Sequence, residues 1–255
     1  IVQARLLRTM GGVYETLGLY AQAEPLEQSA LTLRRQVLDG DDPDIARSQL
    51  ALGTLYNRMG RYREAEPLQS EALAALQAEY GDVHADVAEA QMQLGLTRFL
   101  LGDADGAEAL HRDALQTREQ LLGPDSPEVA SSLAHLGYLL NNRKRYADAE
   151  PYLQQALAIR RRVLGADHHL VAISEDLLGD LYVNMGRLDE AVTLYQDSLQ
   201  ITRKVYAADH PLIAESYFSL GRAYAAQGKV EEARASLLAG LDLVSRTLGP
   251  THISM

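Results

Sequence analysis

Apolar and small residues recur along this chain at steps of three and four, the spacing of one face of an α-helix. Between residues 43 and 59 this stripe comprises Ile45, Ala46, Gln49, Leu52, Gly53, Leu55, Tyr56 and Met59. A second stripe starts near Tyr62 and comprises Ala65, Leu68, Ala72, Leu73 and Leu76. The pattern therefore predicts two consecutive amphipathic helices.

Residues at the ends of both stripes supply the expected helix boundaries. Asp42 is suited to cap a helix that begins at Pro43, where the missing N–H would have no partner in any case. Gly60 and Gly81 end the two helices, since glycine tolerates the left-handed conformation at a helix C-terminus. Pro67 lies early in the second helix, where we expect a bend rather than a break.

The helix pair repeats along the whole chain at an interval of 42 residues. Six glycines hold this register: Gly11, Gly53, Gly95, Gly137, Gly179 and Gly221. Alanine recurs twelve residues after each glycine, from Ala23 to Ala233. The register predicts six repeats, residues 1–42, 43–84, 85–126, 127–168, 169–210 and 211–252, with residues 253–255 beginning a truncated further helix. The predicted fold class is all-α, and residues 1–255 are expected to form a single array.

This register resembles the tetratricopeptide repeat. The residues that match its signature in order are Leu52, Gly53, Tyr56, Gly60, Ala65 and Ala72. The 42-residue length and the Leu-Gly-x-Asp-x-Pro connection at residues 122–127 look like the long variant of kinesin light chains and bacterial signalling proteins. The resemblance implies a right-handed α-solenoid of about twelve antiparallel helices. Two departures are Lys144 in place of Gly60, and Gly240 in place of Ala72, which predicts fraying at the C-terminal end.

Composition and charge narrow the function classes. The formal net charge of -11 argues against general nucleic-acid binding, which needs a basic face. The sequence contains no cysteine, which favours a cytoplasmic protein, and no apolar run or leader that indicates a membrane partner. The chain lacks an initiator Met and begins with Ile1 at the phase where Pro43, Pro127 and Pro211 open later repeats, so we expect a fragment of something longer, and the resemblance implies a bacterial protein.

The sequence offers no recognisable catalytic or cofactor motif. Metal-protease, phosphate-loop and nucleophile-elbow patterns are all missing, so we expect a non-enzyme that uses no cofactor. His84, His168, His210 and His252 share one register, but repeats about 10 Å apart cannot share one metal ion, and helix capping is the favoured interpretation. Arg160, Arg161 and Arg162, together with Arg143, Lys144 and Arg145, are expected to give the fourth repeat a basic edge with a minor capacity for phosphate or acidic partners.

The resemblance also implies a binding site, because the concave groove of this family is lined by the first helix of each repeat. The positions carried over are Arg5, Arg8, Arg47, Asn57, Arg58, Met92, Leu96, Phe99, His135, Tyr138, Asn141, Asn142, Asp176, Asp180, Asn184, Glu215, Phe218 and Arg222. They change from basic through apolar to acidic along the chain. We therefore expect a protein or peptide partner that is acidic toward the first repeats, apolar near Phe99 and Tyr138, and basic near Asp176 and Asp180.

Other functions fit the same pattern. Such residues are also found on ordinary solvated helix faces. The leading hypothesis is a non-catalytic protein-interaction scaffold. The alternatives are a regulatory or sensor arm of a larger bacterial kinase or NTPase, and a module that forms homo-oligomers through its terminal repeats.

Overall fold

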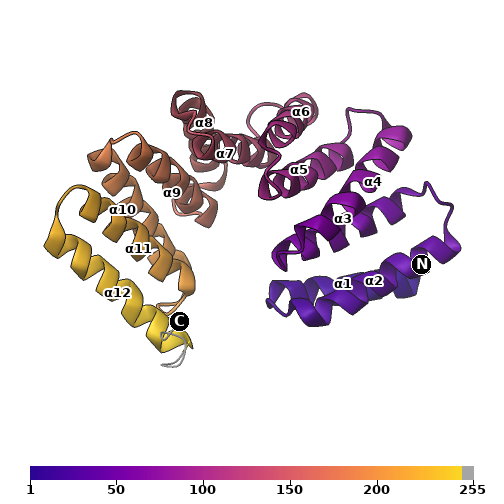
Figure 1. Ribbon diagram of the computed structural model, residues 1–255, viewed down its shortest axis with the longest axis horizontal. Coiled ribbons are helices and arrows are strands. Elements are labelled where there is room, and N and C mark those ends of the chain that lie inside the picture. Colours follow the sequence, from indigo (N-terminus) through magenta and orange to yellow (C-terminus); the bar gives the residue numbers. More distant parts are fainter. Residues whose placement is uncertain (249–255) are drawn as a thin grey trace. The chain divides into compact units, whose positions relative to one another are not determined.

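The computed structural model describes residues 1–248, and α-helices are the only regular elements in that range. The twelve described helices form pairs joined by short turns (Figure 1). Their bounds are α1 (Val2–Thr16), α2 (Tyr20–Val37), α3 (Pro43–Arg58), α4 (Tyr62–Tyr80), α5 (Ala85–Leu100), α6 (Ala104–Leu122), α7 (Pro127–Asn142), α8 (Tyr146–Leu164), α9 (His169–Asn184), α10 (Leu188–Val205), α11 (Pro211–Ala226) and α12 (Val230–Leu248). Each predicted repeat holds one pair, and the predicted all-α fold class of tandem helix pairs is confirmed.

The chain divides into two compact units, with the boundary between Pro124 and Asp125. The first unit contains the pairs α1–α2, α3–α4 and α5–α6, and the second contains α7–α8, α9–α10 and α11–α12. Within each unit, the first helix of a pair, which we call helix A, packs against its own second helix, helix B. Helix B then packs against helix A of the next pair. A single array over residues 1–255 stays a prediction.

The helix boundaries of the second repeat follow from the capping residues. The Asp42 carboxylate accepts a hydrogen bond from the Asp44 N–H at 2.8 Å, and Pro43 is the first helical residue of α3. Gly60 and Gly81 have φ angles of 75° and 74°, the left-handed region in which glycine is favoured. Helix α4 continues through Pro67 without a break.

A helix B side chain sits directly against each repeated glycine of helix A. A Cβ atom added to Gly53 would lie 2.7 Å from Gln69 Cγ, so the glycine provides the space that Gln69 occupies. The residue sixteen positions after each glycine fills this seat in all six repeats: Glu27, Gln69, His111, Leu153, Tyr195 and Leu237. The repeated glycine therefore packs against a different side chain in most repeats. We call these six helix B residues the seat column.

Two buried arginines extend the pattern to the contact between repeats. Arg34 in helix B donates to the Ser48 hydroxyl in the next helix A, and Arg160 donates to Ser174 Oγ at 2.7 Å in the same register. Where helix B carries Leu76 instead, the partner position is Ala90, and both are fully buried. Each pairing either supplies a hydrogen bond to the buried guanidinium or removes the polar group, which limits the cost of burial, while Nε of both arginines has no hydrogen-bond partner.

In the last repeat, Gly240 has a role in packing. Helix α12 continues through this residue, and Gly240 is buried beneath Phe218 of α11. A Cβ atom at Gly240 would lie 2.6 Å from the Phe218 ring, so glycine is the residue that accommodates the large side chain. The expected fraying, like the helix expected at residues 253–255, falls on residues 249–255, which lie outside the described range.

Candidate functional site

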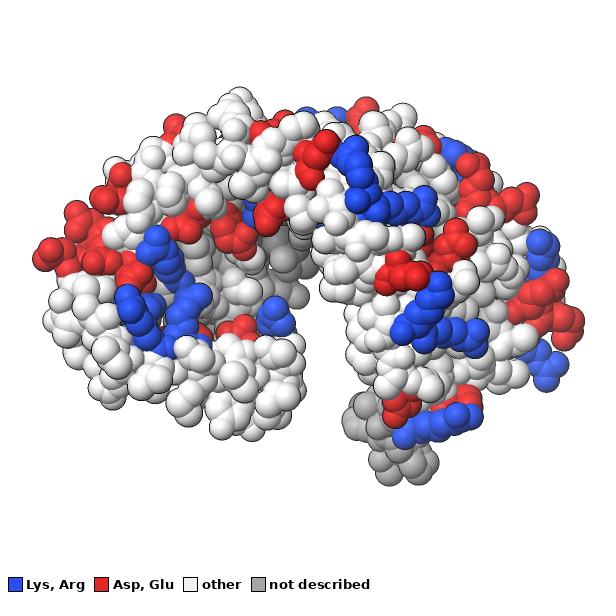
Figure 2. All heavy atoms as spheres, turned by 180° about the vertical axis from the view of Figure 1, so that it is seen from behind, with Lys and Arg blue, Asp and Glu red and all other residues white. Residues whose placement is uncertain are grey.

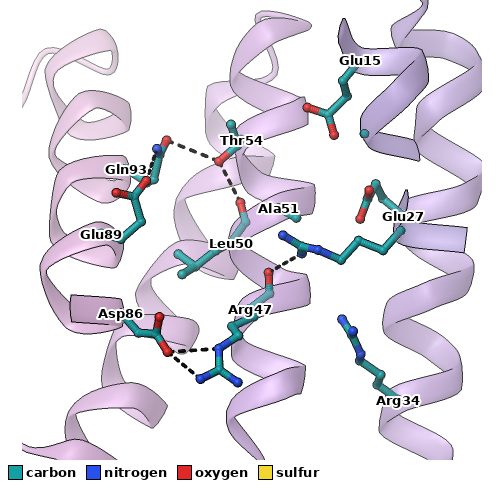
Figure 3. Close-up of a pocket in the computed structure, with 12 residues that line it drawn as sticks. Glu15, Glu27, Arg34, Arg47, Leu50, Ala51, Thr54, Asp86, Glu89 and Gln93 are labelled. Atoms are coloured by element: carbon teal, nitrogen blue, oxygen red, sulfur yellow. Dashed lines mark hydrogen bonds and ion pairs between the residues drawn. The ribbon is translucent and has the colours of Figure 1, made fainter. Parts of the chain in front are cut away.

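In the first unit, the exposed side of helices α1, α3 and α5 encloses an open pocket of about 540 Å³ (Figure 3). We call this the α1–α3–α5 pocket. Helix α1 contributes Arg8, Gly12 and Glu15, and helix α2 reaches it from behind with Glu27 and Arg34. The remaining lining residues are Arg47, Leu50, Ala51, Thr54, Asp86, Glu89 and Gln93, from α3 and α5. Acidic and basic groups therefore share one cavity.

Most of the basic groups of this pocket are engaged within the protein. Arg47 donates to Asp86 at 2.6 Å and to Asp44 at 2.9 Å, and the hydrogen bond to Asp86 raises the pKa of Arg47 above its ordinary value. Arg34 donates to Ser48, and Arg8 Nη1 donates to the Arg47 carbonyl at 2.8 Å. Within the basic stretch expected on the first repeats, Arg47 is thus ion-paired and Arg58 stands 3.9 Å from Glu15.

Glu27 differs from the other acids, because it is buried and its Oε2 atom has no hydrogen-bond partner. Burial raises the pKa of Glu27 to about 7, and the positive charge of Arg8 opposes this shift only in part. Burial also raises the pKa of Glu15, against the attraction of Arg58 and Arg8. Arg58 pairs with Glu15 at 3.9 Å, whereas Glu27 Oε2 is left without a hydrogen-bond donor.

In the second unit, α7 and α9 present the predicted polar and aromatic side chains. His135, Tyr138 and Asn142 are exposed on α7, and the Asn142 amide donates to the Tyr138 carbonyl at 2.8 Å. The buried Tyr195 of the seat column, in α10, donates its hydroxyl proton to Asp180 Oδ1 of α9 at 2.6 Å. This bond holds Asp180 in place at the surface of the unit.

Asp176 lies one helical turn before Asp180 on the same helix. The pKa of Asp176 is raised to about 7, mainly by burial; the side chain of Ser198 opposes the rise, and the neighbouring charges of Asp180 and Glu215 contribute to it. Arg222 of α11 stands 3.9 Å from Asp180. We call the exposed side of α7, α9 and α11 the second-unit face, and it combines one exposed aromatic ring with several carboxylates.

Charges of both signs are interspersed on the surface that Figure 2 displays, and no broad area there carries basic side chains alone. Among residues 1–248, no group of three His, Asp or Glu side chains is arranged to hold a metal ion. None of the described helices combines the length and the apolar character that crossing a bilayer requires.

Comparison with known families identifies the architecture. Models of the tetratricopeptide repeat match residues 2–78, 86–141 and 176–246, and a second model of the same repeat matches residues 129–170. The chain belongs to the tetratricopeptide repeat family. Comparison with curated proteins gave no match.

Solved structures of other proteins share this tetratricopeptide fold. BtubC (BKLC) from P. vanneervenii superimposes with a TM-score of 0.73 at 22% identity, covering 90% of this chain and 91% of that chain. A putative kinesin light chain of P. anserina with nearly identical repeats gives 0.70 at 25% identity, covering 81% and 97%. The apo form of RapI gives 0.65 at 14% identity, covering 90% and 64%. The likeness to kinesin-light-chain-type repeats is thereby confirmed, and at these identities BtubC and RapI show the fold alone.

The tetratricopeptide positions carried over from the family fall into two groups in the structure. Eight are exposed: Arg5, Arg58, His135, Tyr138, Asn142, Asn184, Glu215 and Arg222. Eight are partly buried: Arg8, Arg47, Asn57, Leu96, Phe99, Asp176, Asp180 and Phe218. Asn57 donates to Thr97 Oγ1 at 2.7 Å, which ties it to the neighbouring helix A.

Two expectations about surface residues need correction. Met92 is buried with Ala88 and Ala114, because a long side chain three residues before the repeated glycine turns toward its own helix B. Asn141 is also buried, and its side-chain oxygen accepts from Asn184 at 2.9 Å.

The basic edge expected at residues 143–145 and 160–162 is partly engaged within the protein, and Lys144, Arg145, Arg161 and Arg162 are exposed. Arg160 is buried, Arg161 pairs with Glu175 at 2.7 Å, and Arg162 pairs with Asp125. The predicted capping role of histidine is confirmed at three positions, where Nδ1 accepts from the N–H two residues later: His84, His168 and His210. His252 lies outside the described residues.

Sequence reasoning missed the helix B residues that reach these sites, above all Glu27 and Tyr195. Attention to the first helix of each tetratricopeptide pair excluded them. The sequence does contain an indication of them. The seat column is a fixed register position at which most repeats carry a different side chain.

Proposed function

We propose that this chain is a non-catalytic protein-interaction scaffold that binds peptide segments on the helix A faces of its two units. The observation that carries the proposal is the second-unit face, where exposed Tyr138 stands among His135, Asn142 and the anchored carboxylate of Asp180. An aromatic side chain beside fixed polar groups is the composition typical of protein-binding hot spots.

A basic peptide segment suits this face. Tyr195 fixes Asp180 from behind, and Asp176 and Glu215 add negative charge on the adjoining helix turns. A partner lysine or arginine would pair with Asp180, while an apolar or aromatic side chain of the same peptide packs on Tyr138.

Selection of a random peptide library against the full chain tests this proposal. Selected peptides are expected to bind Tyr138→Ala and Asp180→Asn at least about tenfold more weakly, a difference of about 1.4 kcal/mol. Asp209→Asn, at an exposed position in the loop before α11, is the matched control and should bind as the unchanged chain does. Equal binding by all variants would reject the face as the site.

The contacts of Arg47 limit how the expected acidic ligand segment at the first repeats can be tested. Arg47 is held by Asp44 and Asp86, so reversing its charge would disrupt internal contacts as well as any ligand contact. Arg5 is exposed and supplies a cleaner test. Arg5→Glu is expected to weaken binding of acidic library peptides by more than about 0.5 kcal/mol, and an unchanged affinity would remove this part of the proposal.

Self-association is a second candidate function, favoured by the outer face of α1. Leu6, Met10 and Val13 are exposed there, more than half in the case of Leu6 and Val13. In α3 and α9 the positions in register with Leu6 and Val13 are buried: Ser48, Leu55, Ser174 and Leu181. The partner that fits is a second copy of the chain, whose α12 carries the exposed apolar residues Leu238 and Leu241 on a helix B. Helix B packing onto helix A is the contact already used between repeats.

Sedimentation velocity over a wide concentration range tests this second candidate. The unchanged chain should form larger species as its concentration rises, and Leu6→Glu should abolish them. Val83→Glu changes an equally apolar exposed residue elsewhere and serves as the control. A chain that stays monomeric throughout is evidence against self-association.

A further inference from the structure

Deepening the proposed function, we propose that the α1–α3–α5 pocket receives a basic side chain, the guanidinium or ammonium group of a bound peptide, between Glu15 and Glu27. The inference rests on the proposed peptide binding but concerns a different site, in the first unit. It depends on the buried oxygen of Glu27 that has no hydrogen-bond partner and on the open space at Gly12 on the pocket wall.

Several charged side chains lie at the α1–α2 end of the pocket. Figure 3 shows Glu15 and Arg34 at opposite ends, with Glu27 between them. Arg47 is paired across the pocket with Asp86, and Glu89 is paired with Arg118 at 2.6 Å. Around Glu27 lie Glu15, Arg8 and Arg34, and Arg58 stands 3.9 Å from Glu15. Arg8 donates to the Arg47 carbonyl and Arg34 donates to the Ser48 hydroxyl, and no N–H group reaches Glu27 Oε2. A donor for this oxygen is what this end of the pocket lacks.

The buried carboxylate of Glu27 lacks a hydrogen-bond donor. Glu27 lines the pocket, is only 1% exposed, and leaves Oε2 without a hydrogen-bond partner. A buried acceptor in this state costs folding free energy unless a donor reaches it. The same seat in the next repeat holds Gln69, an uncharged side chain of equal length, whose oxygen accepts from Thr97. A charged group in this seat, left unpaired by the protein, is suited to a ligand that supplies N–H donors and positive charge.

The wall of the pocket is open at one position of α1. Gly12 lies on the pocket wall, and a Cβ atom added there would meet nothing within 4 Å. The positions in register with Gly12 carry side chains in every other repeat: Thr54, Leu96, Tyr138, Asp180 and Arg222. Only the first repeat therefore leaves this place open, directly beside the turn of α1 that carries Arg8 and Glu15.

Titration of the full chain with capped single amino acids tests the proposal. The probes are the N-acetyl amides of arginine, lysine, glutamine and glutamate, followed through the backbone amide NMR signals of Gly11 and Gly12. Arginine or lysine amide should shift both signals to saturation, and glutamine and glutamate amides should not. Saturation by glutamate amide alone, or by none of the probes, would overturn the assignment of a cation pocket.

Three variants locate the site. Glu27→Gln should weaken binding of the basic probe at least tenfold while keeping the shape of the seat, as Gln69 does. Gly12→Phe should block binding by filling the opening, and Gly12→Ala, which adds only a methyl group in open space, should bind as before. Unchanged binding by Glu27→Gln, or equal loss in both Gly12 variants, contradicts the proposal. Library peptides that depend on Tyr138 and Asp180 would still bind, so failure here is distinguishable from failure of the proposed function.

Discussion

At the residue scale, the repeated glycine of helix A acts through the side chain that it admits. Gly11, Gly53 and Gly179 have the same place in the fold, yet they accommodate a carboxylate, an amide and a phenol in turn. The backbone supplies space, and the seat column decides which chemistry lies behind each helix A face. Binding specificity in such an array therefore depends on helix B residues as well as on exposed helix A residues.

The coupling between Gly240 and Phe218 predicts an unusual response to alanine. Ala72 stands in the same register, but Gly240→Ala would place a methyl group 2.6 Å from the Phe218 ring. We expect a loss of about 1–3 kcal/mol from overpacking, which exceeds the gain of about 1 kcal/mol in helix propensity. Thermal unfolding of Gly240→Ala, compared with Gly12→Ala, measures the effect.

The double variant Phe218→Leu with Gly240→Ala provides the check on this mechanism. It reproduces the combination of Leu50 and Ala72 that the second repeat already contains, so stability should recover. A double variant that is no more stable than Gly240→Ala would show that the ring contact is not the cause.

Glu27 predicts a specific dependence of stability on pH. Its pKa rises from 4.5 to about 7 in the folded chain because of burial, in surroundings that include Arg8, Glu15 and Arg34. Between these two values the folded state binds more protons than the unfolded state, so this residue makes the fold less stable as pH rises from 4.5 to 7. Glu27→Gln should remove that loss and raise the free energy of unfolding by roughly 1–3 kcal/mol at pH 8.

Thermal midpoints of the two proteins, measured from pH 4 to pH 8, test this assignment. The difference should be small at pH 4 and should grow up to about pH 7. A difference that is constant over the whole range would mean that the charge of Glu27 is not responsible. A more stable variant that has lost its ligand would also fit the usual conflict between stability and a binding site.

At the element scale, the turn from helix A to helix B requires one residue in the left-handed conformation. Glycine supplies it in five repeats, with φ between 72° and 93°: Gly18, Gly60, Gly102, Gly186 and Gly228. In the fourth repeat Lys144 adopts φ of 60° at the same place. Position in the register, rather than residue type, therefore dictates the backbone conformation.

Lys144→Gly is expected to stabilise the second unit by about 1 kcal/mol, because a residue with a Cβ atom pays roughly 1–2 kcal/mol for this conformation. Chemical denaturation measures the change. Lys144→Ala separates backbone strain from charge, since it removes the positive charge beside Arg143 and Arg145 but keeps the Cβ atom. Equal gains from alanine and glycine would assign the effect to charge.

At the scale of the whole molecule, the division into two units has a consequence for folding. Each unit contains three helix pairs, and about three repeats are needed for a stable array because each pair buries its apolar face only against a neighbour. Separate chains that end at Pro124 or begin at Asp125 are expected to be helical and to unfold cooperatively on heating. Circular dichroism of each half provides the measurement, and a half without a cooperative transition would contradict the expectation.

The sequence alone determined the helix pairs, their boundaries and their number in the described range, because these depend on local rules. The apolar spacing, the caps such as Asp42 and His84, and the glycines after helix A act within a few residues of one another. Because the 42-residue register repeats these signals, a helix boundary that is ambiguous in one repeat is defined by the equivalent positions in the others.

Tertiary structure decided which of the predicted site residues are accessible and which charges remain uncompensated. Met92 is buried and Arg47 is neutralised through contacts with residues distant in sequence, and the open place at Gly12 beside the unpaired Glu27 exists only once α1 and α2 have packed. Burial and ion pairing depend on distances between helices, which periodicity does not contain. Local patterns thus specify the scaffold, whereas the chemistry of its surface depends on how the helices pack.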